Sequence, residues 1–218
     1  MKCVGASAAT GLLTATALMA LIAGCAGRPL HDAGEGQPPR YVGVDVEALE
    51  PGKVSGEMDR LAKLFSQQFV TELKNQSLQL LRLPGGIILL EFAGDAAFET
   101  GSAQLRASSL DFYSRLAEVV LRHDSTVLHI VAHTDGADGD DAGLSLSERR
   151  ALSVAAYLEG SGVPATRLRH EGRGLREPLA SNATAEGQRR NRRLDLILRP
   201  VIEGKETQAW MPPPYLGG

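Results

Sequence analysis

The first strong pattern in the sequence is helical and runs from Val54 to Gln76. Its apolar positions recur at steps of three and four residues, at Met58, Leu61, Phe65, Phe69 and Leu73. That spacing places them on one face of an amphipathic helix. Two interpretations stay open: the helix packs on the domain that follows it, or its apolar face binds a protein partner or a second copy of the chain.

The sequence after Gln76 alternates between strand and helix patterns. Two apolar runs, Leu78–Leu83 and Ile87–Phe92, flank the turn sequence Pro84-Gly85-Gly86 and predict a hairpin. The later patterns predict a helix over Ser108–His123, a strand over Thr126–Ala132, a helix over Leu146–Gly160, and strands over Arg167–Gly172 and Arg193–Leu198. Strands interleaved with helices predict an α/β (α+β) two-layer sandwich with helices on one face of a mixed sheet.

Serine residues mark the predicted starts of both later helices. Ser108 is followed three residues later by Asp111, and Ser145 by Glu148, which is the spacing of capping interactions. Ser147 is an alternative cap for the second of these helices. All of these signals put the start of that helix close to residue 146.

Composition and charge narrow the class of protein. The 218 residues include 23 Lys and Arg and 26 Asp and Glu, a formal net charge of −3, and 43% are hydrophobic. This is ordinary globular usage, which excludes collagen-like, wholly disordered and polytopic membrane proteins. Nucleic-acid binding usually requires a basic face. We therefore expect no nucleic-acid partner, and we interpret the basic run at residues 189–193 as a solvated loop.

The N-terminus has the features of an export signal. Lys2 precedes an uncharged run from Gly11 to Ala23, which is too short to span a bilayer but suits a secretory signal peptide. The sequence that ends in Gly24-Cys25 resembles the lipobox of bacterial lipoproteins. The resemblance implies cleavage after Gly24 and acylation of Cys25, with palmitate among the chains. The alternative is ordinary cleavage beside an incidental cysteine.

The residue after the cysteine also bears on localisation. Residue 26 is Ala rather than Asp, and the resemblance to lipoproteins then implies export to the outer membrane with the domain facing the periplasm. No second long apolar stretch follows. The predicted organisation is a signal peptide over 1–24, the lipidated Cys25 with a flexible Gly- and Pro-rich linker over 25–53, a helix over 54–76, a globular domain over 78–199 and an irregular tail over 200–218.

Two opposite charges are predicted to share a crevice. Asp135 follows the end of a strand, and Arg150 lies in the first turns of the next predicted helix, so both would lie on the same rim of an α/β layer. The carboxylate suits an ammonium group, whereas the guanidinium and the amides of the helix N-terminus suit a carboxylate. Arg192 or Arg193 could complete the part of the crevice that binds the carboxylate. The pair therefore fits a zwitterion, with a plain surface ion pair as the alternative.

Three stretches around these residues resemble one family. They are the segment from Phe98 to Leu105, the block His133-Thr134-Asp135 with Leu146-Ser147 and Arg150, and the late Asn182-Ala183-Thr184 with Asn191-Arg192-Arg193. In this order they resemble the OmpA-like C-terminal domain shared by OmpA, Pal and MotB, from about residue 89 to residue 198. The resemblance implies a β-α-β-α-β-β core, here with an N-terminal helix and an added strand. It also implies non-covalent binding of peptidoglycan.

The same resemblance implies roles for single residues. Asp135 and Arg150 would hold the free amino and carboxylate groups of meso-diaminopimelate in the stem peptide, and Arg192 is also implicated. Thr134, Leu146 and Arg193 complete the predicted site. His133 and Phe98 are interpreted as packing residues rather than ligand contacts.

The sequence departs from the family pattern in the loop after Asp135. Gly143 replaces a usual Asn that helps to contact the ligand in relatives, so affinity could be lower. Asp138, Asp140 and Asp141 add negative charge, which would favour the ammonium end of a ligand. A metal site from His133 with these acids lacks the residue order of a calcium loop, and we expect no metal and no cofactor.

The sequence thus predicts a lipid-anchored tether between the outer membrane and the cell wall. We expect no enzyme, because no serine has a base and an orienting acid in pattern and no cysteine lies in the predicted domain. The expected partners are peptidoglycan, outer-membrane lipid and an envelope protein. Two alternatives stay open: a wall-anchoring component of a secretion or Tol-Pal-like assembly that uses the 54–76 helix, and a periplasmic wall hydrolase.

Overall fold

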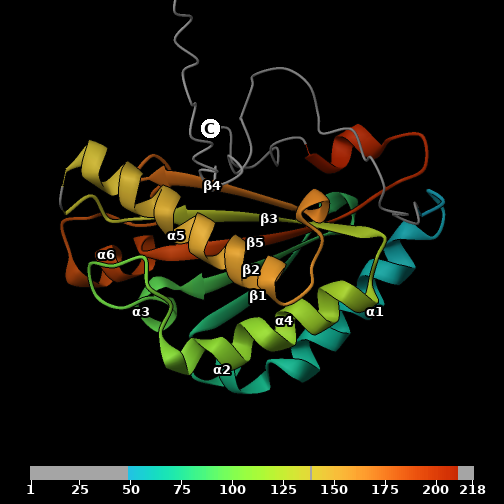
Figure 1. Cartoon of the computed structure of the whole chain (residues 1–218), viewed down its shortest axis with the longest axis horizontal. Helices are drawn as coiled ribbons and strands as arrows, with labels where there is room; N and C mark the ends of the chain where they lie inside the picture. Colours follow the sequence, from blue (N-terminus) through green and yellow to red (C-terminus); the bar gives the residue numbers. More distant parts are fainter. Residues whose placement is uncertain (1–48, 138, 211–218) are drawn as a thin grey trace, which may run out of the picture. The chain divides into compact units, whose positions relative to one another are not determined.

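The computed structural model describes residues 49–137 and 139–210 (Figure 1). The predicted signal peptide, Cys25, most of the linker, Asp138 and residues 211–218 lie outside the described residues. Among the residues that the structure does describe, the search for a helix long and apolar enough to cross a bilayer finds none.

Six α-helices and five strands make up the described part. The helices are α1 (Val54–Gln68), α2 (Val70–Lys74), α3 (Gly94–Ala97), α4 (Leu110–Arg122), α5 (Asp140–Gly160) and α6 (Ala185–Asn191). The strands are β1 (Leu78–Leu83), β2 (Ile87–Ala93), β3 (Thr126–His133), β4 (Leu168–Gly174) and β5 (Arg193–Pro200). Short 3-10 turns cover Pro84–Gly86, Ala107–Ser109, Ala165–Arg167 and Glu206–Trp210.

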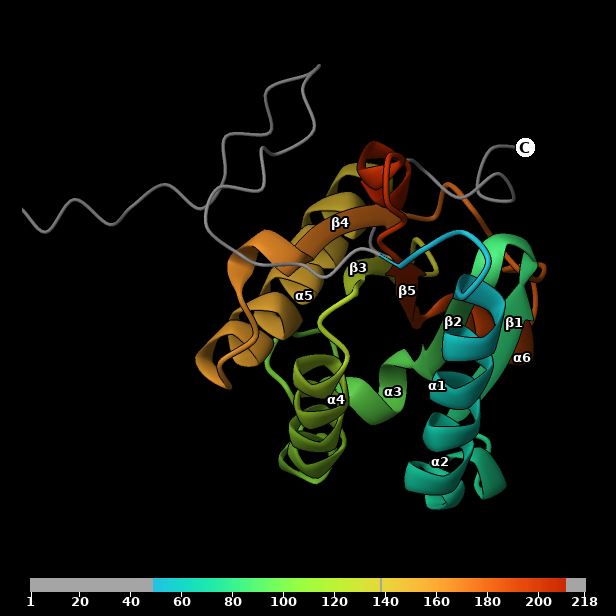
Figure 2. The same cartoon turned by 90° about the vertical axis from the view of Figure 1, so that its right-hand side faces the viewer.

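The strands form one mixed sheet in the order β1-β2-β5-β3-β4. Neighbouring strands are antiparallel except β3 and β4, which are parallel. The helices α1, α4 and α5 lie on the same face of this sheet (Figure 2). The predicted fold class, a two-layer α/β sandwich with a mixed sheet, is therefore confirmed.

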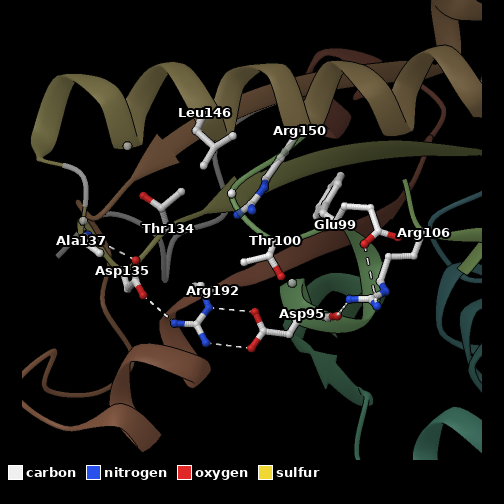
Figure 3. A pocket seen from close by; sticks show the side chains of 15 residues that line it. Asp95, Glu99, Thr100, Arg106, Thr134, Asp135, Ala137, Leu146, Arg150 and Arg192 are labelled. Carbon is white, nitrogen blue, oxygen red and sulfur yellow. Dashed lines mark hydrogen bonds and ion pairs between the residues drawn. The ribbon is translucent and has the colours of Figure 1, made fainter. Parts of the chain in front are cut away.

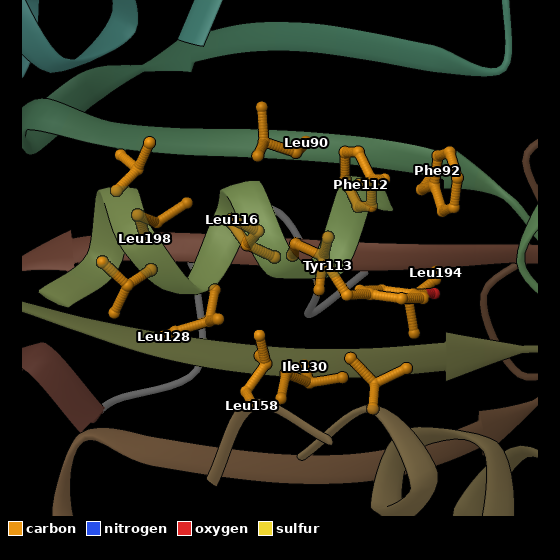
Figure 4. Close-up of a cluster of buried hydrophobic side chains, with 14 of the residues drawn as sticks. Leu90, Phe92, Phe112, Tyr113, Leu116, Leu128, Ile130, Leu158, Leu194 and Leu198 are labelled. Atoms are coloured by element: carbon orange, nitrogen blue, oxygen red, sulfur yellow. The ribbon is translucent and has the colours of Figure 1, made fainter. Parts of the chain in front are cut away.

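The two faces of the sheet differ in chemistry because side chains alternate along a strand. One face carries the apolar side chains that pack under the helices, including Leu90, Phe92, Leu128, Ile130, Leu194, Leu196 and Leu198 (Figure 4). Phe92 stacks on Phe112 of α4 with ring centroids 4.2 Å apart. The alternate positions of β3 and β5 place His133, Arg193 and Asp195 on the other face.

The pattern at 54–76 gives two helices rather than one, separated at Phe69. Met58, Leu61 and Phe65 are buried in the same core as the sheet, and Phe69 is buried with them. Arg115 of α4 lies over the Phe69 ring, 4.9 Å from its centroid. The apolar face of α1 thus packs on the domain, so this face is not available to a partner while the domain is folded.

Several predicted boundaries were wrong. Helix α5 begins at Asp140, six residues before Leu146, and no side-chain cap bond forms at its start. Ser147 lies inside the helix, where its Oγ accepts from the Gly174 amide at 2.9 Å and ties α5 to β4. No side-chain cap forms at α4 either. The short helices α3 and α6 were not predicted, because each has too few turns to show a period.

Part of the predicted irregular tail has regular structure. β5 runs to Pro200, and the 3-10 turn Glu206–Trp210 follows it. Trp210 and Ala209 pack on Val127 and Val201 in a small separate cluster. The globular part therefore extends past residue 199.

The contact between α5 and β4 leaves no room for a side chain at Gly172. A Cβ at that position would clash with the backbone amide of Glu148 and lie 2.6 Å from the Ser147 Oγ. We expect Gly172→Ala to lower the free energy of unfolding by about 1–3 kcal/mol, as overpacking does. Chemical denaturation measures the change.

Gly56 provides the matched control, since it lies inside α1 with nothing within 4 Å of its Cβ position. Gly56→Ala should leave stability unchanged or raise it by about 0.5–1 kcal/mol, because Ala is the better helix former. Equal stability of Gly172→Ala and the unchanged protein would contradict the close packing described for α5 and β4.

Candidate functional site

A cavity of about 580 Å³ lies at one rim of the sheet (Figure 3). Its walls come from α3, the loop before α4, the loop after β3, helix α5 and the residue before β5. The lining residues are Gly94, Asp95, Phe98, Glu99, Thr100, Gly101, Arg106, Thr134, Asp135, Gly136, Ala137, Gly143, Leu146, Arg150 and Arg192.

Strand order explains why charged residues that are distant in sequence meet at this rim. β5 lies between β2 and β3 and is antiparallel to both. The ends of β2 and β3 therefore flank the start of β5. Asp95 follows the end of β2, Asp135 follows the end of β3, and Arg192 immediately precedes β5. The topology alone puts Arg192 between the two carboxylates.

Arg192 bonds both of these carboxylates. Its Nε and Nη2 donate to the two oxygens of Asp95 at 2.8 and 2.7 Å, and its Nη1 donates to Asp135 Oδ2 at 2.6 Å. These hydrogen bonds hold the pKa of Arg192 above its ordinary value. The hydrogen bond from Arg192 also lowers the pKa of Asp95, outweighing the opposing effect of burial.

The loop after β3 fixes the other oxygen of Asp135. The Oδ1 atom accepts a hydrogen bond from the backbone amide of Ala137 at 3.3 Å, so the side chain of Asp135 itself closes a turn. Gly136 between them has a φ of 70°, a left-handed value that favours glycine. The Asp135 side chain is 11% exposed, so the carboxylate lies at the cavity wall rather than in bulk solvent.

Arg150 reaches the cavity from the middle of α5, not from its first turns as the sequence predicted. Its Nε donates to the Ser102 carbonyl at 2.9 Å, and its guanidinium carbon lies 5.0 Å from the centre of the Phe98 ring. The helix amides expected to help at residue 146 are bonded inside the helix, because α5 begins at Asp140. Phe98 is buried, as predicted, and also supports the Arg150 guanidinium.

Thr134 and Leu146 line the cavity as predicted. The Oγ1 of Thr134 is buried and has no hydrogen-bond partner among the residues that the structure describes. Gly143 lies next to it, and a Cβ there would be 2.8 Å from that oxygen. A larger residue at 143 would therefore require the Thr134 side chain to move. The small residue gives the hydroxyl a place in the cavity wall.

Arg193 was predicted for the site, but the structure places it outside the residues that line the cavity. It follows Arg192 in the chain, and successive side chains of a strand point to opposite faces. Arg193 is buried on the far face, where its Nε lies 3.1 Å from Asp195 Oδ1 and its Nη1 donates to the Glu177 carbonyl at 3.1 Å. His133 is buried there too, with Nε2 3.1 Å from Asp195 Oδ2, which agrees with its predicted packing role.

Two acids and one base on the α3 side of the cavity were not predicted as site residues. Asp95, Glu99 and Arg106 line it, and Arg106 Nη2 lies 3.8 Å from Glu99 Oε2. Glu99 belongs to a stretch singled out in the sequence, but Asp95 carried no motif. The strand order β2-β5-β3 would have located it, because that order brings the end of the hairpin to the same rim.

The cavity wall thus carries three carboxylates and three guanidiniums. Figure 3 shows Arg192 between Asp95 and Asp135, with Arg150 on another wall. The guanidinium of Arg150 lies over the ring of Phe98. A wall with separated charges of both signs suits a zwitterion better than an ion of one sign. Within residues 49–137 and 139–210, no three His, Cys, Asp or Glu side chains come together to hold a metal ion.

The depressed pKa of Asp95 gives a prediction for stability. A carboxylate whose pKa is lowered on folding stabilises the protein at pH values above its pKa in the unfolded state, near 3.8. This contribution is lost as the pH falls through the pKa of the folded state. We expect Asp95→Asn to lower the melting temperature at pH 7 and at pH 5. The difference from the unchanged protein should shrink only below about pH 4. A difference that already vanishes at pH 5 would contradict the bridge.

Comparison with known proteins agrees with this architecture. Residues 97–192 match the OmpA family. The chain is 36% identical over 117 residues to the probable lipoprotein YiaD of Escherichia coli, covering 54% of this chain and 53% of YiaD. It is 31% identical over 105 residues to the peptidoglycan-binding protein ArfA of Mycobacterium bovis, covering 48% of this chain and 32% of ArfA.

A solved structure gives the same fold. The cell wall anchor of the T6SS from Pseudomonas aeruginosa superposes with a TM-score of 0.57 at 26% identity, over 62% of this chain and 96% of that one. The matched part spans only about half of YiaD and a third of ArfA, so these matches concern the domain rather than whole proteins. The sequence match and the fold together identify residues 97–192 of this chain as an OmpA family domain.

Proposed function

We propose that this domain binds peptidoglycan non-covalently through the diaminopimelate of the stem peptide. The observation that carries the proposal is that Asp135 and Arg150 line the walls of one cavity. The free end of diaminopimelate bears an ammonium and a carboxylate on one carbon, and each group then has a partner of opposite charge. ArfA, a relative, is itself described as peptidoglycan-binding, and the similar T6SS structure is described as a cell wall anchor.

Each residue of the cavity has a role in this proposal. Asp135 accepts hydrogen bonds from the ammonium, and Arg150 donates to the carboxylate. Arg192 orients Asp135 through its bond to Oδ2. Leu146 packs on the aliphatic part of the ligand, and Thr134 forms part of the cavity wall. Binding of this kind forms and breaks no covalent bond, so the protein acts as a tether rather than as an enzyme.

We also propose that Cys25 is acylated and anchors the chain to the outer membrane, with the domain in the periplasm. The lipobox-like sequence supports this, and YiaD carries the description of a probable lipoprotein. Several acyl chains on one cysteine contribute about 0.8 kcal/mol per buried CH₂ and hold a protein at a membrane stably. The linker after Cys25 would let the domain reach the wall.

A second candidate is a wall-anchoring component of a larger envelope assembly. The similarity to the T6SS wall anchor favours it. The apolar face of α1 is buried in the domain core, so a protein partner would have to bind another surface. Co-purification of envelope proteins by the full chain, with and without sacculi, distinguishes this candidate from a plain tether.

The cavity charges provide the first test of wall binding. We expect Asp135→Ala and Arg150→Met each to weaken co-sedimentation with purified sacculi by about ten- to a hundredfold, as loss of a charge-assisted hydrogen bond of about 1.5–3 kcal/mol implies. Met keeps the apolar stem that packs on Phe98. Circular dichroism checks that both variants stay folded.

The chain offers matched controls for both changes. Arg149→Ala removes an exposed guanidinium beside Arg150 on the same helix, and Asp59→Ala removes a carboxylate that pairs with Arg82 outside the cavity. Both control variants should sediment like the unchanged protein. Folded Asp135→Ala and Arg150→Met variants that sediment normally would falsify the assignment of the site. Soluble wall fragments released by the purified protein would instead indicate a hydrolase.

The lipid anchor has its own test. Because Cys25 is the proposed acylation site, Cys25→Ser should move the protein from the membrane fraction to the soluble periplasmic fraction. Cell fractionation with immunoblotting measures the shift, and Cys3→Ser serves as the matched control that stays in the membrane. Wild-type amounts of the Cys25→Ser protein in membranes would refute lipid anchoring.

A further inference from the structure

The geometry points to Asp95 as a residue that determines which ligands the cavity accepts. We infer that Asp95, by pairing with Arg192, leaves Asp135 with net negative charge and makes that end of the cavity selective for an ammonium group. The inference rests on the proposed function and deepens it. Asp95 precedes residues 97–192, so the part of the chain that matches the family does not include it.

Arg192 carries less positive charge than the negative charge of the two carboxylates it bonds. Three of its N–H donors are used by two carboxylates, two on Asp95 and one on Asp135. One positive charge is thus shared by two negative charges, and the group carries a net charge of −1. An approaching ammonium is attracted to this end of the cavity, where the Asp95 side chain is 54% exposed and the Asp135 side chain, at the cavity wall, is 11% exposed.

Removal of the Asp95 carboxylate would change the charge of this end of the cavity. Arg192 and Asp135 would then form a neutral pair, and the two donors that now bond Asp95 could bond an incoming carboxylate bidentately. The cavity would present two guanidiniums to a ligand, those of Arg150 and Arg192. Such a cavity would favour a dicarboxylate without amino groups over an amino acid. Asp95 therefore sets the ligand class without being one of the two residues proposed to bind the zwitterion.

The backbone holds Asp95 in place. The amide of Gly94 donates to the carbonyl of Arg192 at 2.8 Å, and a Cβ at Gly94 would lie 2.8 Å from that same oxygen. Helix α3 therefore lies directly against the residue that Asp95 binds. The lowered pKa of Asp95 keeps its carboxylate ionised well into the acidic range. The negative charge is therefore present under the conditions in which an ammonium would bind.

The test compares two ligands that differ only in their amino groups. Calorimetry measures the binding of meso-diaminopimelate and of pimelate, the same seven-carbon dicarboxylate without amines, to the full chain and to Asp95→Asn. The unchanged protein should prefer diaminopimelate. In Asp95→Asn this preference should fall by roughly tenfold, as expected when one charge near a partly buried site is removed, while pimelate binds equally or more tightly.

Three further variants separate selectivity from structure. Asp95→Glu retains the charge and should retain the preference, whereas Asp95→Ser, a smaller substitution, should lose it like Asp95→Asn. Asp59→Asn removes a carboxylate from an ion pair outside the cavity and should leave the preference unchanged. Near-ultraviolet circular dichroism checks the folding of each variant. The test needs only one of the two variants Asp95→Asn and Asp95→Ser to be folded.

The outcomes distinguish this inference from the proposed function. In one outcome, the unchanged protein binds sacculi and diaminopimelate, and a folded Asp95→Asn or Asp95→Ser variant has the same ligand preference. This outcome would overturn the role of Asp95 and leave the proposal of wall binding intact. A variant at Asp95 with a lower melting temperature but an unchanged ligand preference would show that the bridge is purely structural. That result would also overturn the proposed role of Asp95. Failure of the unchanged protein to bind diaminopimelate or sacculi would overturn both.

Discussion

The structure of the site depends on one interaction, the bridge of Arg192 between Asp95 and Asp135. It joins the ends of β2 and β3 across the start of β5 and orients the carboxylate that faces the cavity. An ion pair of this kind contributes little to stability when it is exposed. Its importance here lies in geometry and charge: it turns two acids and one base into a negatively charged end of a small cavity.

The opposite wall is built by different means. Arg150 comes from α5, and its position is set by the Ser102 carbonyl and the ring of Phe98. Close packing of α5 on β4, which requires Gly172, fixes the helix on the sheet. The separation of the two charged walls is therefore a property of the core and the sheet order. The proposal that the cavity holds a ligand with two opposite charges on one carbon rests on this separation.

How well the sequence predicts a feature depends on whether the signal lies within one stretch of the chain or arises only from the arrangement of the strands. Sequence pattern predicted β1, β2 and β3 from apolar runs and α4 from helical periodicity, each to within a few residues, because these signals are local and strong there. It misplaced the start of α5, where serines at 145 and 147 resembled caps but lie inside the helix. Motifs predicted Asp135, Arg150 and Arg192 in one cavity. Asp95 was missed, and Arg193 was included although it lies outside the cavity. Both positions depend on strand order and on the face to which a side chain points, and neither property is local.

The most direct measurement is the structure of the chain bound to a stem peptide that contains meso-diaminopimelate. The account predicts the ammonium within hydrogen-bond distance of Asp135, the carboxylate on Arg150, and Arg192 still bonded to both Asp95 and Asp135. A ligand that lies in the opposite orientation, or that binds outside this cavity, would contradict it.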